Sequence, residues 1–108
     1  MGGRQSYLGE FEQVVLLAVA RLKAEAYGMG VRSEIVERTG REVTVGAMYA
    51  TLDRLVAKGY LRSRDEAQDG RPKRFFAITA TGVDALEAAR ELQARMWAGL
   101  RLPKGGPR

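Results

Sequence analysis

The side chains best suited to chemistry in this chain of 108 residues are positively charged, and they are clustered. Residues 54–74 contain seven lysines and arginines but only three acids, whereas residues 1–53 carry a small net negative charge. Lysine and arginine bind polyanions through ion pairs and hydrogen bonds, so this polarity favours a polyanionic partner. The alternative is a solvated basic face that only keeps the protein in solution.

The side chains that most enzymes use are missing. The sequence has no histidine and no cysteine, which removes the commonest general base, thiol nucleophiles, disulfides and the usual zinc ligands. It also lacks a pair of carboxylates in an apolar setting and a glycine-rich phosphate loop. We therefore expect a protein that is not an enzyme and that needs no cofactor or metal.

The apolar segments are too short for a membrane protein. The longest run, residues 14–20, falls well below the roughly 18 to 20 residues that a membrane span needs. The first residues lack the pattern of a signal peptide, and the absence of cysteine fits the cytoplasm. A cytoplasmic protein without a membrane partner is expected.

The segment VGAMYATLDRLVAKGYL, residues 45–61, has two different faces when drawn as a helix. One face is apolar and predicts core: Val45, Met48, Leu52, Leu55 and Val56, with Tyr49 at the edge. The opposite face has small side chains in its first turns and cations in its last: Ala47, Ala50, Thr51, Arg54 and Lys58. A helix in the major groove of DNA needs slim residues where it goes deepest and cations beside phosphates. An ordinary exposed face is the alternative, but it does not explain this order.

Two helices are expected ahead of this segment. Residues 8–26 carry an apolar stripe at helical spacing: Leu8, Phe11, Val15, Ala18, Val19 and Leu22. A short second helix is expected around Val31 and Ile35, with Gly40 ending it, and Thr44 suits the N-cap of the third helix. Helix, short connection and helix indicate a helix-turn-helix, although other small helical bundles contain the same pattern.

The segments YLRSRDE and RFFAIT predict two strands joined by a turn at Asp69-Gly70. Their alternation places Phe76 and Ile78 on one face, with Phe75 on the other. A basic hairpin directly after a DNA-binding helix would be a wing, with its cations in a minor groove or on phosphates: Arg71, Lys73 and Arg74. Charges that protect an exposed edge strand from aggregation are the alternative.

The segment TATGVDALEAARELQARMWAGL predicts a final helix with a wide apolar band, which contains Val83, Ala85, Leu86, Ala89, Leu92, Met96, Trp97 and Leu100. Such a band predicts contacts both with its own domain and with a second subunit. The two-fold symmetry of a homodimer would match a palindromic DNA site. Trp97 would be either a buried aromatic of the dimer core or the wall of a pocket for flat apolar ligands.

Taken in this order, the chain resembles the PadR family of bacterial transcriptional regulators. The resemblance rests on LGEFEQVVLLAV, AYGMGVRSEI, TGREVTVGAMYATLDRLVAKGYL and DGRPKRFFAITATGVDAL. Ala50 stands where proline is common in the family, and Phe75-Phe76 replaces the usual tyrosines. The resemblance implies an α+β fold, a winged helix-turn-helix with an additional C-terminal dimerisation helix, in the short form with a single terminal helix. It also implies a homodimeric repressor that binds a palindromic operator, and in some members of the family a planar or phenolic effector near the dimer interface causes release from DNA.

The resemblance also implies roles for individual residues. Tyr49 and Arg54 are expected to hold phosphate and Thr51 to contact a base, within a DNA-facing set of Thr44, Val45, Ala47, Tyr49, Thr51 and Arg54, joined by Arg71, Lys73 and Arg74 on the wing. The expected dimer interface comprises Phe11, Val15, Leu86, Ala89, Leu92, Met96 and Leu100. The expected effector pocket, Met96 and Trp97, rests on the aromatic and apolar character of these side chains and not on the resemblance.

The expected division of the chain is a DNA-binding domain at residues 1–79, a dimerisation helix at 80–101 and a disordered tail at 102–108. A winged-helix module that binds another protein, without specific DNA binding, is the alternative function.

Overall fold

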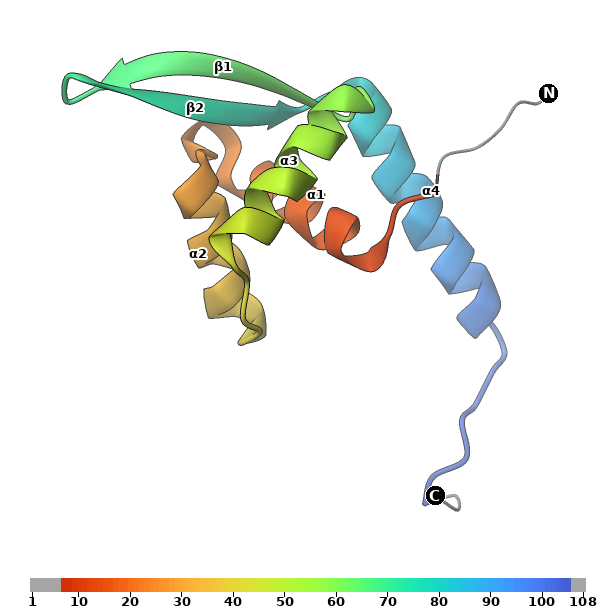
Figure 1. Cartoon of the computed structure of the whole chain (residues 1–108). Helices are drawn as coiled ribbons and strands as arrows, with labels where there is room; N and C mark the ends of the chain where they lie inside the picture. Colours follow the sequence, from red (N-terminus) through yellow and green to blue (C-terminus); the bar gives the residue numbers. More distant parts are fainter. Residues whose placement is uncertain (1–6, 106–108) are drawn as a thin grey trace.

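The computed structural model describes residues 7–105; residues 1–6 and 106–108, the last part of the expected tail, lie outside it. The elements are α1 (Glu10–Leu22), a short 3₁₀ helix η1 (Lys23–Glu25), α2 (Gly28–Thr39), α3 (Val45–Ala57), β1 (Leu61–Gln68), β2 (Arg71–Ile78) and α4 (Ala80–Trp97). The first three helices form a bundle, the hairpin extends from one side and α4 leaves on the other (Figure 1). The predicted α+β winged helix-turn-helix with an additional C-terminal helix is confirmed.

Polar side chains and one glycine set the helix ends, with Thr44 and Gly40 in the roles expected of them. The Thr44 hydroxyl accepts a hydrogen bond from the Ala47 N–H at 3.1 Å and caps α3. The Thr79 hydroxyl accepts from the Gly82 N–H at 3.0 Å and caps α4. Gly40 follows α2 with a φ of 71°, a left-handed conformation that glycine adopts without a steric penalty. These signals are local, which is why the sequence predicts them.

The hydrophobic core lies between the three helices and the hairpin. Each element supplies fully buried side chains: Val15, Leu16 and Val19 from α1, Val31 and Ile35 from α2, Met48, Leu52 and Leu55 from α3, and Phe76 from β2. The apolar face predicted for α3 is therefore core, except that Val45 in its first turn is exposed. Leu16 lies outside the apolar stripe of α1 and is also buried, because α1 contacts α2, α3 and β2 on different sides.

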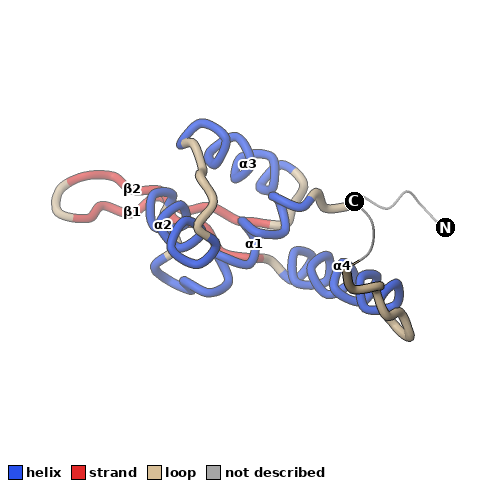
Figure 2. The backbone as a smooth tube through the Cα atoms, turned by 90° about the horizontal axis from the view of Figure 1, so that it is seen from below, coloured by secondary structure: helices blue, strands red, loops and turns tan. Residues whose placement is uncertain are grey.

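The hairpin pairs from Leu61↔Ile78 to Gln68↔Arg71. The predicted turn at Asp69 and Gly70 is present, and the φ values of 54° and 75° are those of a two-residue turn with both central residues left-handed. The strands extend beyond the bundle, and the turn lies at the far end of the molecule from α4 (Figures 1 and 2). The hairpin is thus a long projecting wing.

The expected alternation along β2 is wrong at Phe75. Both Phe75 and Phe76 are buried, because the segment ahead of α2 lies along β2. There the Phe76 N–H donates to the Ala26 carbonyl at 2.8 Å, and Tyr27 forms a bridge with Phe75. The Tyr27 and Phe75 ring centroids are 5.9 Å apart. This covers the face of β2 that the alternation would leave in solvent.

Helix α4 is docked only at its start. A side chain at Gly82 would overlap the Tyr60 carbonyl oxygen, so glycine permits this close approach. From Arg90 onward every described residue is exposed. The helix ends at Trp97, so Leu100 and the end of the predicted 80–101 helix lie in the following loop. No helix in residues 7–105 is long and apolar enough to cross a membrane.

Candidate nucleic-acid interface

The beginning of α3 is exposed and carries only short side chains. Thr44, Val45, Ala47 and Ala50 are all exposed there, and a Cβ added at Gly46 would meet no atom within 4 Å. The Thr44 hydroxyl is already used in the helix cap. The N-terminal end of a helix carries a partial positive charge and unpaired N–H groups, which favour a phosphate. This end of α3 is slim enough to enter a groove.

Thr51 is not on this exposed surface, and the expected base contact is wrong for this conformation. Its side chain is only 3% exposed, and its hydroxyl accepts a hydrogen bond from Arg54 Nη2 at 3.3 Å. The reason is helical geometry, since Thr51 lies one turn from Met48 and Leu55, which both face the core. The Thr51 hydroxyl therefore contacts Arg54 and not the exposed surface of α3.

Replacing Thr51 with alanine is expected to lower stability and to leave base preference unchanged. The change removes one hydrogen bond and a small buried group, so the free energy of unfolding should fall by about 1 kcal/mol. Thermal melts measure the stability, and selection of bound sequences from random duplexes measures the preference. If the variant selects a different base at any position, Thr51 does contact a base in the complex.

Tyr49 and Arg54, the two expected phosphate ligands on α3, both contact other helices. The Tyr49 ring is half-buried and lies against Gly28 at the start of α2, where any larger side chain would overlap it. Arg54 Nε donates to Glu12 Oε2 of α1 at 3.1 Å, and its side chain remains 52% exposed. Arg54 therefore has both a protein partner and an open side.

Glu12 is a central residue of this surface that the sequence did not single out. Its Oε1 accepts from the Gly9 N–H at 2.8 Å, and its Oε2 accepts from Lys58 Nζ at 2.9 Å as well as from Arg54 Nε. Burial alone raises the pKa of Glu12, but the bonds from Lys58, Gly9 and Arg54 outweigh it and hold the pKa below its usual value. The carboxylate is therefore ionised at neutral pH. Only the Gly-x-x-Glu spacing of a helix start signals part of this role.

The three predicted wing cations occupy different settings. Arg71 is exposed directly after the turn and makes no ion pair with another described residue. Lys73 Nζ lies 4.1 Å from the centroid of the Tyr27 ring, a distance typical of a cation–π contact. Arg71 is thus the most available cation near the tip, while Lys73 also braces the wing against the bundle.

Arg74 lies at the base of the wing. Its Nη1 is 2.8 Å from Asp53 Oδ1 of α3, and its guanidinium carbon lies 4.9 Å from the Phe76 ring centroid. These contacts join β2 to α3. Arg74 is therefore less available for DNA than Arg71, and it fixes the angle between the helix and the wing.

The sequence pattern of the Transcriptional regulator PadR-like family matches residues 16–88, which run from the middle of α1 through α2, α3 and the wing to the first half of α4. The chain belongs to the PadR family. Its members are transcriptional regulators and not enzymes. Transcriptional regulator Rv3488 of Mycobacterium tuberculosis is 39% identical over 62 residues. That alignment covers 57% of this chain and 57% of the mycobacterial protein, so this chain spans little more than half of its length.

Solved structures resemble this PadR chain over most of its length. A chain in the complex structure of hsRosR-S4 is 30% identical, with a TM-score of 0.66, and the match covers 87% of this chain and 77% of that one. A PadR family transcriptional regulator from Eggerthella lenta DSM 2243 has a TM-score of 0.71 at 19% identity, covering 82% of this chain and 76% of that one. The second likeness supports the fold alone.

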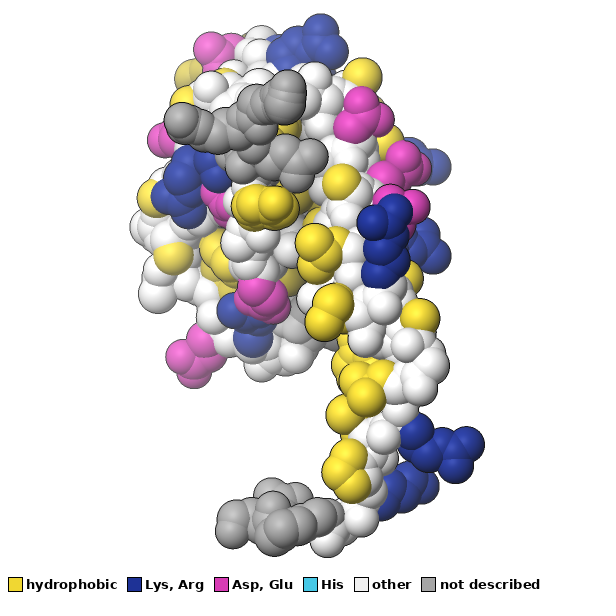
Figure 3. Space-filling model, turned by 90° about the vertical axis from the view of Figure 1, so that its right-hand side faces the viewer, with side chains coloured by type: hydrophobic (Ala, Val, Ile, Leu, Met, Phe, Trp, Pro, Cys, Tyr) yellow, Lys and Arg dark blue, Asp and Glu magenta, His cyan; other side chains and the backbone are white. Residues whose placement is uncertain are grey.

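The expected dimer residues of this PadR chain fall into three groups. Val15 has no exposed surface, because the core of its own subunit surrounds it, so its assignment to the interface is wrong. Phe11, Leu86 and Ala89 are partly buried. Leu92, Met96 and Leu100 are more than half exposed, at 51%, 73% and 53%. Apolar side chains follow α4 along one side (Figure 3).

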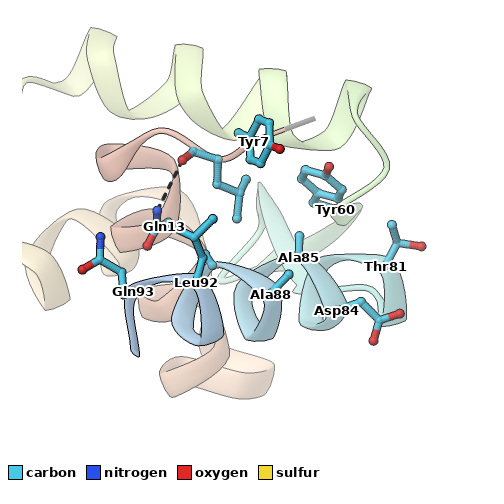
Figure 4. Close-up of a pocket in the computed structure, with 11 residues that line it drawn as sticks. Tyr7, Gln13, Tyr60, Thr81, Asp84, Ala85, Ala88, Leu92 and Gln93 are labelled. Atoms are coloured by element: carbon cyan, nitrogen blue, oxygen red, sulfur yellow. Dashed lines mark hydrogen bonds between the residues drawn. The ribbon is translucent and has the colours of Figure 1, made fainter. Parts of the chain in front are cut away.

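An open groove of about 550 Å³ lies between α4 and a wall formed by residues 7–13 and Tyr60 (Figure 4). One wall consists of Tyr7, Leu8, Gln13 and Tyr60, and the other consists of Thr81, Asp84, Ala85, Ala88, Ala89, Leu92 and Gln93 of α4. The Gln13 side chain donates to the Leu8 carbonyl at 3.3 Å within the first wall. Met96 and Trp97, the expected pocket residues, lie beyond this groove on the exposed part of α4.

Proposed function

We propose that this PadR protein is a homodimeric repressor that acts in the cytoplasm, binds a palindromic operator and is released by a small effector. The observation that carries the proposal is the combination of a slim, exposed start of α3 with a basic wing beside it. Membership of the PadR family indicates transcriptional regulation as the activity. The exposed side chains at the start of α3 and on the wing support DNA binding as its basis.

The start of α3 is the element best shaped for the major groove. Val45, Ala47 and Ala50 offer only small apolar groups, which suit contact with thymine methyls and with the groove floor. No arginine, asparagine or glutamine stands in this part of the helix, so base reading by hydrogen bonds would be modest. Much of the preference would come from DNA shape, which a minor-groove arginine such as Arg71 can sense.

The apolar side of α4 supports a dimer. Ala85, Ala89, Leu92 and Met96 share one face of the helix, and the exposure of Leu92 and Met96 would be unusual for helix residues that meet only water. A second copy of the same helix offers a complementary apolar surface. A two-fold axis there would place two α3 helices and two wings on successive half-sites of a palindrome.

An effector that is planar or phenolic would bind where α4 and a second subunit enclose space. Trp97 and Met96 supply an aromatic face and a flexible thioether, both suited to flat apolar ligands. A ligand there would change the angle of α4 and hence the spacing of the two α3 helices. Release from DNA follows if that spacing no longer fits successive half-sites.

Selection of bound sequences from random duplexes is the direct test of the DNA-binding part of this proposal. We expect a palindrome to emerge and to be bound at least about 1,000-fold more tightly than a scrambled duplex. A protein–protein module would instead bind all duplexes weakly and equally. Addition of planar or phenolic compounds to the complex with the selected duplex then tests release.

A further inference from the structure

Glu12 lies under the cationic end of α3 and is the only buried acid among residues 7–105. One carboxylate oxygen accepts hydrogen bonds from Lys58 Nζ at 2.9 Å and from Arg54 Nε at 3.1 Å, while the other accepts one from the Gly9 N–H. These contacts join residues 42 and 46 positions apart in the chain. Glu12 thus connects the start of α1 to the last turn of α3.

The two cations keep donors that Glu12 does not use. A guanidinium has five N–H groups and an ammonium has three, and the bonds to Glu12 and Thr51 engage two of those on Arg54. The Arg54 side chain is half-exposed and that of Lys58 is partly exposed. Because Arg54 and Lys58 carry two positive charges and Glu12 carries one negative charge, the cluster of three side chains keeps a net positive charge. An anion that approaches α3 from solvent therefore still meets positive charge and unused donors.

A side chain that is already held loses less conformational freedom when it binds a phosphate. Arg54 is held at Nε by Glu12 and at Nη2 by Thr51, so its outer edge has a fixed direction. Without Glu12, both Arg54 and Lys58 would move among many rotamers. Ordering these side chains on DNA binding would then cost conformational entropy, and this cost would oppose the electrostatic gain from removing the acid.

We infer that Glu12 is a positioning residue for DNA binding, which holds Arg54 and Lys58 so that their remaining donors face the phosphates beside α3. The inference rests on the proposed function, in which α3 enters the major groove. It opposes the simple electrostatic expectation, because removal of an acid close to a DNA-binding helix ordinarily strengthens binding. The two views predict changes of opposite sign.

Glu12→Gln separates them. Glutamine is neutral and of similar size, and its carbonyl can still accept from the Gly9 N–H. At a temperature where melts show both proteins to be fully folded, we expect the variant to bind the selected duplex about 5- to 10-fold more weakly. Glu10→Gln is the matched control, because it removes an equal charge two residues away, where the carboxylate pairs with Arg41 at 2.9 Å. The control should bind no more weakly than wild type.

Glu12→Asp tests the same idea without a change in charge and serves if the glutamine variant does not fold. Its carboxylate is one methylene shorter and cannot reach both cations from the same backbone position. We expect weaker binding, whereas a purely electrostatic role predicts no change.

A variant that lacks both cations, Arg54→Ala with Lys58→Ala, shows whether Glu12 acts through them. Adding Glu12→Gln to this background should cause no further loss. The inference would be overturned if Glu12→Gln lowered DNA affinity by the same factor in that background. It would also be overturned if the single Glu12→Gln variant bound DNA as tightly as wild type. Both outcomes would leave the proposed function intact. If wild type itself prefers no duplex, the proposed function is wrong and the role of Glu12 is wrong with it.

Discussion

Replacing Leu92 with aspartate is expected to dissociate the proposed dimer into monomers. Leu92 lies in the middle of the apolar face of α4 and is 51% exposed in a single subunit, so the subunit itself can accommodate the new side chain. Across a two-fold interface the change occurs twice, and each copy loses apolar burial and introduces a carboxylate without a partner. We expect the dimer to be weakened by roughly 3 kcal/mol or more, which is about 100-fold in the dissociation constant.

Sedimentation measures this change directly, and Ala94→Asp is the matched control. Ala94 lies on the opposite side of the same helix and is exposed, so the control introduces an identical charge away from the proposed interface. The control should sediment as wild type. A Leu92→Asp variant that remains a dimer would place the interface on another surface, such as the exposed part of α1 around Leu17. DNA affinity should fall together with dimerisation, because each half-site would then be bound separately.

The parts of the fold that the sequence predicted are those with local causes. The cap at Thr44, the left-handed Gly40 and the turn at Asp69-Gly70 each depend on a few neighbouring residues. The apolar face of α3 follows from helical spacing over four turns. These features fix the order and approximate bounds of the elements, and the order in turn indicated the winged helix-turn-helix.

The errors arise where a distant segment decides the environment of a residue. Phe75 is buried because Tyr27, 48 positions earlier in the sequence, lies along β2. Thr51 lies at the border of the two faces of α3, one turn from the buried Met48 and Leu55, and a helical wheel does not specify whether the rest of the fold covers a residue at that border. Glu12 reads as a surface acid within its own helix, since its two cationic partners come from α3.

The dimer residues illustrate a second limit of sequence reasoning. An apolar stripe shows that a residue will be covered but not which neighbour covers it. Val15 and Leu92 carry the same kind of signal, yet Val15 has no exposed surface in one subunit while Leu92 is half-exposed. Only the packed subunit separates the residues that form its own core from those that remain for a partner.

Replacing Arg71 and Lys73 together with alanine is expected to weaken binding to every duplex and to flatten its dependence on salt. Each lost phosphate contact lowers the slope of log K against log salt by about one, so the pair should lower it by about two. Each contact contributes on the order of 1 kcal/mol, and the affinity should fall roughly 10- to 100-fold. Titrations at several salt concentrations, with the selected duplex and a scrambled one, measure both quantities.

Arg101→Ala with Lys104→Ala is the matched control for the wing variant. It removes two exposed cations from the segment after α4, at the opposite end of the molecule from the wing (Figure 1). Non-specific attraction by the total charge would weaken both variants equally, whereas a wing that contacts phosphates predicts a loss only in the first. The two wing positions also differ from each other, because Lys73 contacts Tyr27. Lys73→Ala alone should therefore lower the melting temperature as well as the affinity, while Arg71→Ala alone should lower only the affinity.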